Sequence, residues 1–252
     1  MARDFVPAEG DKITTGFTSH ATQRTYSIWA FTDGAGGGNR GRFFEKRVAG
    51  AEVELLYYNT ADANQPFVHY VRSWSGTNGE WRTPTSSLTT GAWVNIIVTY
   101  DAGATTNDPA IYLNGVSQTI TQLVGDPTGS VDTNTDAYVI GARGNDAIRN
   151  FDGKEAEFAI WDRILTADEI AGISKGFSPL FFLRSLVSYS PLIRNMVDLK
   201  NGAITDTGTT EFAHPRIIYP TPSQIRRYTK ASTPPPSSGF FPSRRMMRGI
   251  GI

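Results

Sequence analysis

The sequence contains no cysteine, which excludes disulfide frameworks, thiolate metal sites and cysteine nucleophiles. Histidine is scarce as well: His20, His69 and His214 lie in separate segments, and no two of them have metal-ligand spacing. Long apolar runs are also missing, because the most apolar stretch, residues 177–197, is interrupted by Arg184, Pro191 and Arg194. We therefore expect neither a thiolate metal centre nor a membrane-spanning helix.

Acidic residues are absent after Glu211, although the whole chain has 24 basic and 24 acidic residues. The segment after Glu211 carries seven basic residues and seven of the 14 prolines. Residues 1–211 therefore keep 17 basic against 24 acidic residues, a net charge of −7. The basic, proline-rich segment cannot build its own core. Since the overall charge is balanced, we expect no nucleic-acid or membrane partner.

Short apolar segments separated by turn residues predict an all-β protein. The segments expected to form strands are residues 26–32, 52–58, 67–74, 93–100, 110–113, 137–141 and 155–161. Charged and apolar residues alternate from Glu52 to Leu55, so we expect one face of that strand to be wet. Asn114-Gly115 predicts a tight hairpin turn, because both residues tolerate positive φ. The pattern describes a two-sheet antiparallel β-sandwich of the jelly-roll type.

One short helix is expected from about residue 167 to residue 175. Thr166 and Glu169 have the spacing of a capping box, and Gly176 stands where the helix must end. The expected organisation is an irregular lead-in over residues 1–24, the sandwich over 25–177, a wrapping extension over 178–214 and an extended basic, proline-rich C-terminal arm over 215–252.

Three segments in order carry a family resemblance. They are residues 91–101 (GAWVNIIVTYD), residues 110–115 (AIYLNG), and residues 151–166 (FDGKEAEFAIWDRILT) running on into Asp168-Glu169-Ile170. Together they resemble laminin G-like domains of the concanavalin A-like lectin/glucanase superfamily. The resemblance implies a concanavalin A-like jelly roll, a fold that hosts lectins, hydrolases, adhesion modules and virion components.

A second resemblance lies in the extension. Residues 188–194 (SYSPLIR), 207–210 (TGTT) and 214–220 (HPRIIYP) resemble the corresponding part of laminin G-like proteins encoded by phages. This resemblance implies a non-enzymatic structural protein of a tailed-phage virion, such as a capsid decoration or cement protein or a head or tail accessory protein, assembled in the host cytoplasm. Its partners would be the major capsid protein or neighbouring copies, in a homo-oligomer or a lattice. The alternative is a soluble or surface carbohydrate-binding lectin whose arm is a linker.

The arm supplies the candidate partner-binding residues. Ordering such a segment costs conformational entropy, which burial against another chain would offset. Its arginines would pair with acidic surfaces, and its apolar side chains would serve as anchors. The candidates are Arg226, Arg227, Phe240, Phe241, Arg244, Arg245, Met246, Met247 and Arg248.

Catalysis is not expected. Hydrolases of the resembling fold place three carboxylates on one strand at alternate positions, and here only Glu155 and Glu157 have that spacing. Asp162 lies too far along the chain to complete the array. We interpret the two glutamates as a solvated strand face and predict a protein that is not an enzyme.

A calcium site formed by loop aspartates is one alternative to consider. Ca²⁺ needs six to eight converging oxygens, and the sequence has no dense acidic loop. Turn-forming side chains that cap their own backbone explain these residues better. We therefore expect no cofactor, with Ca²⁺ as the open alternative. The aspartates considered are Asp101, Asp108, Asp132, Asp136, Asp146 and Asp152.

Four aromatic residues could stack on sugar rings: Trp74, Trp81, Tyr57 and Tyr58. Trp74 and Trp81 are the candidate glycan-binding residues, because they flank a polar, glycine-containing loop where an aromatic platform would lie. Packing in the core or at its rim is the alternative, and the sequence favours it. The glycine-rich residues 33–41 lack a Gly-Lys-Ser/Thr sequence and a following helix. We interpret them as a flexible hairpin tip rather than a phosphate-binding loop.

Overall fold

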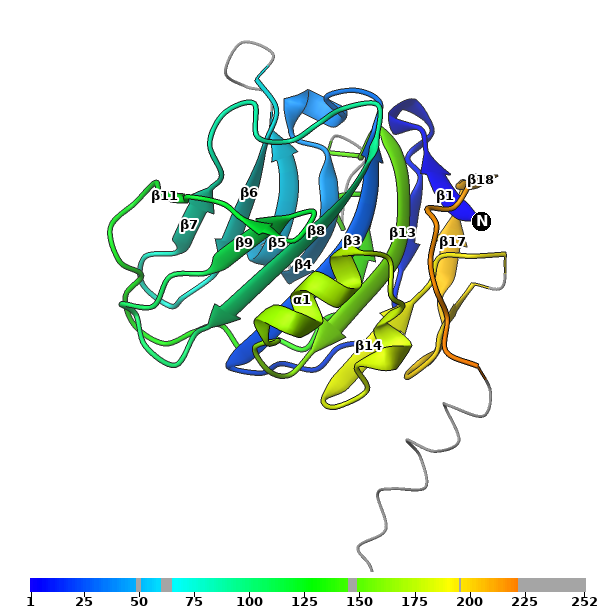
Figure 1. The fold of residues 1–252 in the computed structure, drawn as a ribbon. Helices are drawn as coiled ribbons and strands as arrows, with labels where there is room; N and C mark the ends of the chain where they lie inside the picture. The colour runs from blue at the N-terminus through cyan, green and yellow to red at the C-terminus, as the bar shows by residue number, and fades with distance from the viewer. Residues whose placement is uncertain (49–50, 60–64, 145–148, 195, 222–252) are drawn as a thin grey trace, which may run out of the picture. The chain divides into compact units, whose positions relative to one another are not determined.

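Two eight-stranded antiparallel sheets form the sandwich in the computed structural model (Figure 1). The structure describes residues 1–48, 51–59, 65–144, 149–194 and 196–221. The chain divides into Met1–Tyr219, which contains both sheets, and Pro220–Ile252. The predicted all-β sandwich with one short helix is confirmed.

Sheet A has the strand order β10-β9-β8-β3-β13-β1-β18, and β14 also pairs with β13. Its strands are β1 (Ala2–Phe5), β3 (Gln23–Thr32), β8 (Trp93–Asp101), β9 (Ala110–Leu113), β10 (Val116–Ser117), β13 (Gly153–Trp161), β14 (Leu186–Ser190) and β18 (Thr210–Phe212).

Sheet B has the order β11-β7-β6-β5-β4-β12-β2-β17. Its strands are β2 (Lys12–Thr14), β4 (Arg42–Val48), β5 (Ala51–Asn59), β6 (Phe67–Arg72), β7 (Gly79–Arg82), β11 (Thr121–Gln122), β12 (Tyr138–Ile140) and β17 (Thr205–Thr207). The remaining elements are the β15–β16 pair (Val197–Asp198, Gly202–Ala203), helix α1 (Ala167–Ser174) and the short turns η1 (Pro7–Glu9), η2 (Gly37–Asn39) and η3 (Pro179–Phe181).

Alternation along the strands builds the core between the sheets. In β3, Tyr26, Ile28 and Ala30 face the interior and are at most 1% exposed, while Trp29 and Phe31 face outward and are half-buried. Tyr26 packs on Phe44 of the opposite sheet with ring centroids 4.9 Å apart. Burying such aromatic side chains contributes about 1.5–3 kcal/mol each to folding.

Helix α1 covers part of the outer face of sheet A, in front of β8, β3 and β13 (Figure 1). The predicted capping box is present, because the Glu169 amide donates to the Thr166 hydroxyl and the Thr166 amide donates to the Glu169 carboxylate. Ile170 and Ile173 pack on a smaller cluster that includes Trp161. The Trp161 indole donates to the Phe182 carbonyl at 2.7 Å.

Two expectations about the strands are wrong. Residues 1–24 are not an irregular lead-in, because β1 pairs with β13 in sheet A and β2 pairs with β12 in sheet B. These strands are too short to show an alternation of apolar and polar residues, and only pairing with distant strands stabilises them. The expected wet face of β5 is also absent: Glu54 is 1% exposed and accepts hydrogen bonds from the Tyr70 and Tyr138 hydroxyls at 2.6 and 2.8 Å.

The C-terminal segment of the first unit returns to sheet A. Ile218 forms a parallel bridge with Phe177, so the unit extends beyond residue 215, where the sequence places the start of the arm. Met1 and Tyr219 line one pocket of about 380 Å³. The two ends of this unit therefore lie beside each other.

Candidate functional site

The tryptophans proposed as a glycan platform are in the core. Trp74 is 6% exposed and Trp81 is fully buried, and both belong to the main hydrophobic cluster. Trp81 alternates on β7 with Glu80 and Arg82, which face outward, so the pleat turns its indole ring toward Tyr70. A sugar cannot reach either ring, so the platform hypothesis is wrong and the packing alternative is right.

Tyr57, on the outer face of sheet B, is also covered. The Arg42 guanidinium lies 4.5 Å from its ring centroid, and the His69 ring stacks on it at 4.5 Å. The Tyr57 hydroxyl lies 2.6 Å from Nδ1 of His69. Burial lowers the pKa of His69 and raises the pKa of Tyr57 to about 12. This outer face therefore offers no free aromatic ring at Tyr57.

A pocket of about 300 Å³ opens where loops from both sheets meet at one end of the sandwich. We call it the loop-end pocket. Its apolar side is provided by Tyr58 and Pro66, and its polar groups come from loop residues. The lining residues are Asp33, Gly34, Ala35, Asn39, Tyr58, Pro66 and Thr90.

The glycine-rich loop between β3 and β4 forms one wall of this pocket, and it is packed rather than a free hairpin tip. The Gly37 amide donates to the Asn150 carbonyl at 2.8 Å, and the Asp33 amide donates to the Asp152 carbonyl at 2.9 Å. Gly36 has φ +68°, and a Cβ there would lie 2.5 Å from the Asn150 carbonyl oxygen. Glycine therefore permits the close packing that fixes this wall.

Three polar side chains of the loop-end pocket have hydrogen-bonding capacity left. Within the described ranges, no residue donates to or accepts from the side chains of Asn39, Tyr58 and Thr90. Burial, and then the Asp152 carboxylate, raise the pKa of Tyr58, so its hydroxyl stays a donor at neutral pH. One amide and two hydroxyls beside an apolar wall can bind a polyhydroxylated ligand.

Carboxylates surround one side of the loop-end pocket. Asp33 pairs with the Lys154 ammonium group, whose nitrogen lies 3.9 Å from the Asp4 carboxylate. Burial raises the pKa of Asp152, and the Asp33 carboxylate raises it further, while Lys154 opposes both. Burial likewise raises the pKa of Asp4, with Lys154 opposing and Asp33 adding to the effect. Three carboxylates therefore share one ammonium group, which leaves an excess of negative charge.

The family model described as the Concanavalin A-like lectin/glucanases superfamily, of the laminin G type, matches residues 8–171. The chain belongs to this superfamily. The match spans β2 to α1, so it includes every residue of the loop-end pocket. No curated protein sequence matches the chain.

Solved structures share the concanavalin A-like fold at low sequence identity. A Bacteroides ovatus protein, provisionally described as carbohydrate binding, is similar with a TM-score of 0.62 and 18% identity over 83% of this chain. The chain spans 58% of that protein's length. Tailspike protein 2 of the Escherichia coli O157:H7 bacteriophage CAB120 is similar with a TM-score of 0.53 and 13% identity, over 75% of this chain and 26% of the tailspike. At these identities the likeness shows the fold.

The two glutamates of β13 are buried in the concanavalin A-like domain, contrary to the solvated face that we expected. Glu155 is fully buried and pairs with the inward-facing Ala30, so its side chain points between the sheets. Glu157 is 1% exposed and has φ +58° at a β-bulge, where the pleat shifts. Since neither carboxyl group lines the loop-end pocket, they do not form a pair there for glycoside hydrolysis.

Two of the loop aspartates act as turn formers, whereas Asp108 accepts from the Trp81 indole at 2.7 Å. Asp101 Oδ1 accepts from the Gly103 amide at 2.9 Å, and Asp132 Oδ1 accepts from the Asn134 amide at 2.8 Å. Asp101 and Asp108 also line a second pocket of about 440 Å³. Among the described residues, no group of three His, Asp or Glu side chains is arranged to hold a metal, and no helix is long and apolar enough to cross a membrane.

The arm residues proposed as partner contacts, residues 226–248, lie outside the described residues, as does Asp146. Among the pocket residues, Tyr58 was a candidate for stacking on sugar rings, whereas Asn39 and Thr90 were not predicted from the sequence. Asn39, beside the glycine-rich run, has a local signal, and Thr90 joins the pocket through the fold.

Proposed function

We propose that the chain is a non-catalytic carbohydrate-binding module whose sugar site is the loop-end pocket. One observation carries the proposal. The hydrogen-bonding groups of the Asn39, Tyr58 and Thr90 side chains lie beside the Pro66 ring and have no partners in the described structure. Membership of a lectin-containing superfamily and the likeness to the Bacteroides ovatus protein support it.

The pocket suits a small, polar ligand. Its volume of about 300 Å³ lies at the low end of ligand sites, which span about 300–1,000 Å³, so one sugar unit would fill it. Apolar C–H groups of the sugar would pack on Pro66 while its hydroxyls reach Asn39 and Thr90. The Asp33 carboxylate would accept a charge-assisted hydrogen bond.

The same pocket argues for binding without hydrolysis. Among its described lining residues, Asp33 is the one carboxylate, whereas glycoside hydrolysis uses an acid and a second carboxylate across the bond. We therefore propose that bound glycans leave the site unchanged.

A glycan array followed by titration calorimetry tests this function. Asn39→Ala and Thr90→Ala should each weaken sugar affinity by about 3- to 10-fold, because each removes one hydrogen bond. Thr106→Ala is the matched control, since Thr106 lines the second pocket, and should leave affinity unchanged. Equal affinities in all variants, or no sugar binding at all, would overturn the proposal.

A second proposal places this module on a tailed-phage virion, with residues 220–252 as its anchor. The likeness to a domain-sized part of a tailspike and the basic, proline-rich composition of the arm support it. The partners would be the major capsid protein or neighbouring copies. Density-gradient sedimentation of the source lysate with mass spectrometry tests it. Co-migration with particles, lost on deleting residues 222–252, is expected, and migration as a free small protein would refute it.

A further inference from the structure

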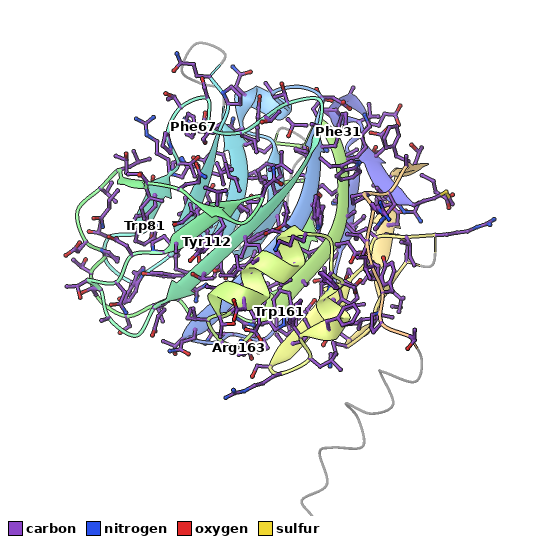
Figure 2. The ribbon with its side chains drawn as sticks, in the orientation of Figure 1. Phe31, Phe67, Trp81, Tyr112, Trp161 and Arg163 are labelled. Atoms are coloured by element: carbon purple, nitrogen blue, oxygen red, sulfur yellow. The ribbon has the colours of Figure 1, made fainter. Side chains whose placement is uncertain are left out.

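A row of aromatic rings crosses the outer face of sheet A. Phe31 on β3 pairs with Trp93 on β8, and their ring centroids lie 5.9 Å apart. Phe212 on β18 continues the row, 6.3 Å from Phe31. Figure 2 shows Phe31 beyond helix α1, toward one end of the sheet, whereas Trp161 lies beside the helix. This part of the sheet face is therefore outside the cluster that the helix covers.

These rings are accessible, unlike the aromatic side chains of the core. Phe212 is 37% exposed, and Phe31 and Trp93 are half-buried, whereas Trp81 and Phe44 are fully buried. Half-exposed aromatic rings side by side form an apolar surface with flat and edge-on elements, which is uncommon on a solvated sheet face. Such a surface can stack on the C–H faces of sugar rings.

The row is continuous with the loop-end pocket. Asp33 lines the pocket and follows Phe31 by two positions, while Thr90 lines the pocket and precedes Trp93 by three. The Gly91 amide donates to the Thr32 carbonyl at 2.9 Å. This hydrogen bond joins the two chain segments that run from the pocket to the row of rings. A ligand that leaves the pocket on this side therefore meets Phe31 and Trp93 next.

The charges along this path select the ligand. The Lys154 ammonium nitrogen lies 4.6 Å from the Phe212 ring centroid and 5.2 Å from that of Phe31, and it is already paired with Asp33. Asp4 and Asp152 add negative charge that this single ammonium does not balance. A glycan with carboxylate or sulfate groups would be repelled here, whereas a neutral or amino-sugar chain would not.

We infer that the module binds an extended glycan, with one unit in the loop-end pocket and the following units stacked on Trp93 and Phe31, and that this glycan is neutral or carries amino groups. The inference rests on the proposed carbohydrate-binding function and adds the length and charge class of the ligand. The sheet face beyond helix α1 then acts as an extension of the pocket.

The test uses the full chain on an array of cello-, chito-, chitosan and oligogalacturonate fragments of one to six units. Signal should rise at least tenfold from one to four units on a neutral or amino-sugar series, and oligogalacturonates should be the weakest ligands. For the best series, Trp93→Ala should abolish the gain with length in titration calorimetry while single-unit affinity stays within twofold. Because both affinities come from one variant, a folding defect would lower both and be recognised.

Phe177→Ala is the matched control, since Phe177 is 36% exposed but lies outside the row, and it should keep the gain with length. Trp93→Tyr should restore most of the gain, because it keeps a stacking ring. Binding of single sugars with no gain on lengthening, or strongest binding to oligogalacturonates, would overturn this inference and leave the proposed function standing. No binding to any carbohydrate would overturn both.

Discussion

The Tyr219 hydroxyl donates a 2.6 Å hydrogen bond to the Glu157 carboxylate, joining residues 62 positions apart. The other Glu157 oxygen accepts from the Tyr189 hydroxyl at 2.6 Å, and Nε2 of His214 lies 3.2 Å from the oxygen that Tyr219 binds. Glu157 can meet all three because the β-bulge of β13 turns it outward with φ +58°. One buried carboxylate thus holds the segment that ends the first unit.

Tyr219→Phe should loosen residues 214–219. Losing a hydrogen bond to a charged, buried acceptor costs about 1.5–3 kcal/mol, so the free energy of unfolding should fall by that order. Hydrogen exchange of the Ile218 amide should quicken more than that of core strands. Tyr112→Phe is the control, since the Tyr112 hydroxyl makes no hydrogen bond to any residue that the structure describes. Unchanged exchange at Ile218 would contradict the holding role of Glu157.

Glu155 should make the protein less stable as the pH rises. Both carboxyl oxygens are buried without a hydrogen-bond partner in the described part of the chain, and burial raises the pKa of Glu155 well above its ordinary 4.5. Below pH 4.5 the group is protonated in both the folded and the unfolded chain and does not affect pH dependence. Above that, folding requires a proton that the unfolded chain has released, at about 1.4 kcal/mol per pH unit.

Glu155→Gln should remove this slope. Urea unfolding from pH 4.5 to 7 measures it as the difference between wild type and variant, which should grow with pH in favour of the variant. Glu211→Gln, at an exposed position on β18, is the control and should follow the wild type. A parallel pH dependence of wild type and Glu155→Gln would show that Glu155 ionises in the folded protein.

Glu54 should have the opposite effect, although it is equally buried. Burial alone would raise the pKa of Glu54, but Arg72 and the Tyr70 hydroxyl outweigh burial and hold the pKa below its ordinary value. Its contribution to stability is therefore present at neutral pH and lost as the pH falls through the folded pKa. Glu54→Gln should cost about 3–5 kcal/mol at pH 7, because Arg72 would remain buried and unpaired.

Chemical denaturation at pH 7 and pH 3 measures the effect of Glu54→Gln, which should shrink at the lower pH. Glu52→Gln is the control on the same strand, since Glu52 is 36% exposed where it pairs with Arg42 and Arg47. That substitution should cost less than about 1 kcal/mol. Equal costs for the two variants would contradict the role assigned to burial.

Gly36→Ala should impair sugar binding although residue 36 does not line the loop-end pocket. Alanine at φ +68° and ψ −175° is strained, by about 1–3 kcal/mol, and its Cβ would clash with the Asn150 carbonyl and Gly41. The loop would shift, and with it Asn39 in the loop-end pocket. Gly125→Ala is the control, because a Cβ there meets nothing within 4 Å. Thermal unfolding and glycan affinity should fall together in Gly36→Ala, and normal affinity would show that this wall is not part of the site.

Local signals were enough for the elements that depend on neighbours in sequence. The capping box at Thr166 and Glu169 and the positive φ at Asn114 and Gly115 are both present, and residues 110–113 form β9 as expected. Each of these signals describes an interaction within a few residues, so the sequence alone can specify it.

The side of the sheet that a residue faces was harder to predict. Trp81 lies on the short strand β7, and Glu155 lies on β13, which the sequence predicts correctly. The side of the sheet that each residue faces depends on how the two sheets pack together, and in β13 also on the bulge at Glu157. The loop-end pocket was missed for the same reason, because Asn39 and Thr90 belong to two connections and Tyr58 to the end of β5, and only the sandwich brings them together. No local pattern encodes such a meeting of loops.

Met1 and Tyr219 line the same pocket, and the labelled N-terminus lies next to β18 (Figure 1). A module with neighbouring ends occupies almost no length along a polypeptide that carries it, so it can be placed within the loop of a host protein without pushing the flanking segments apart. The loop-end pocket includes neither of these residues. Grafting the module by its ends would therefore leave the loop-end pocket intact.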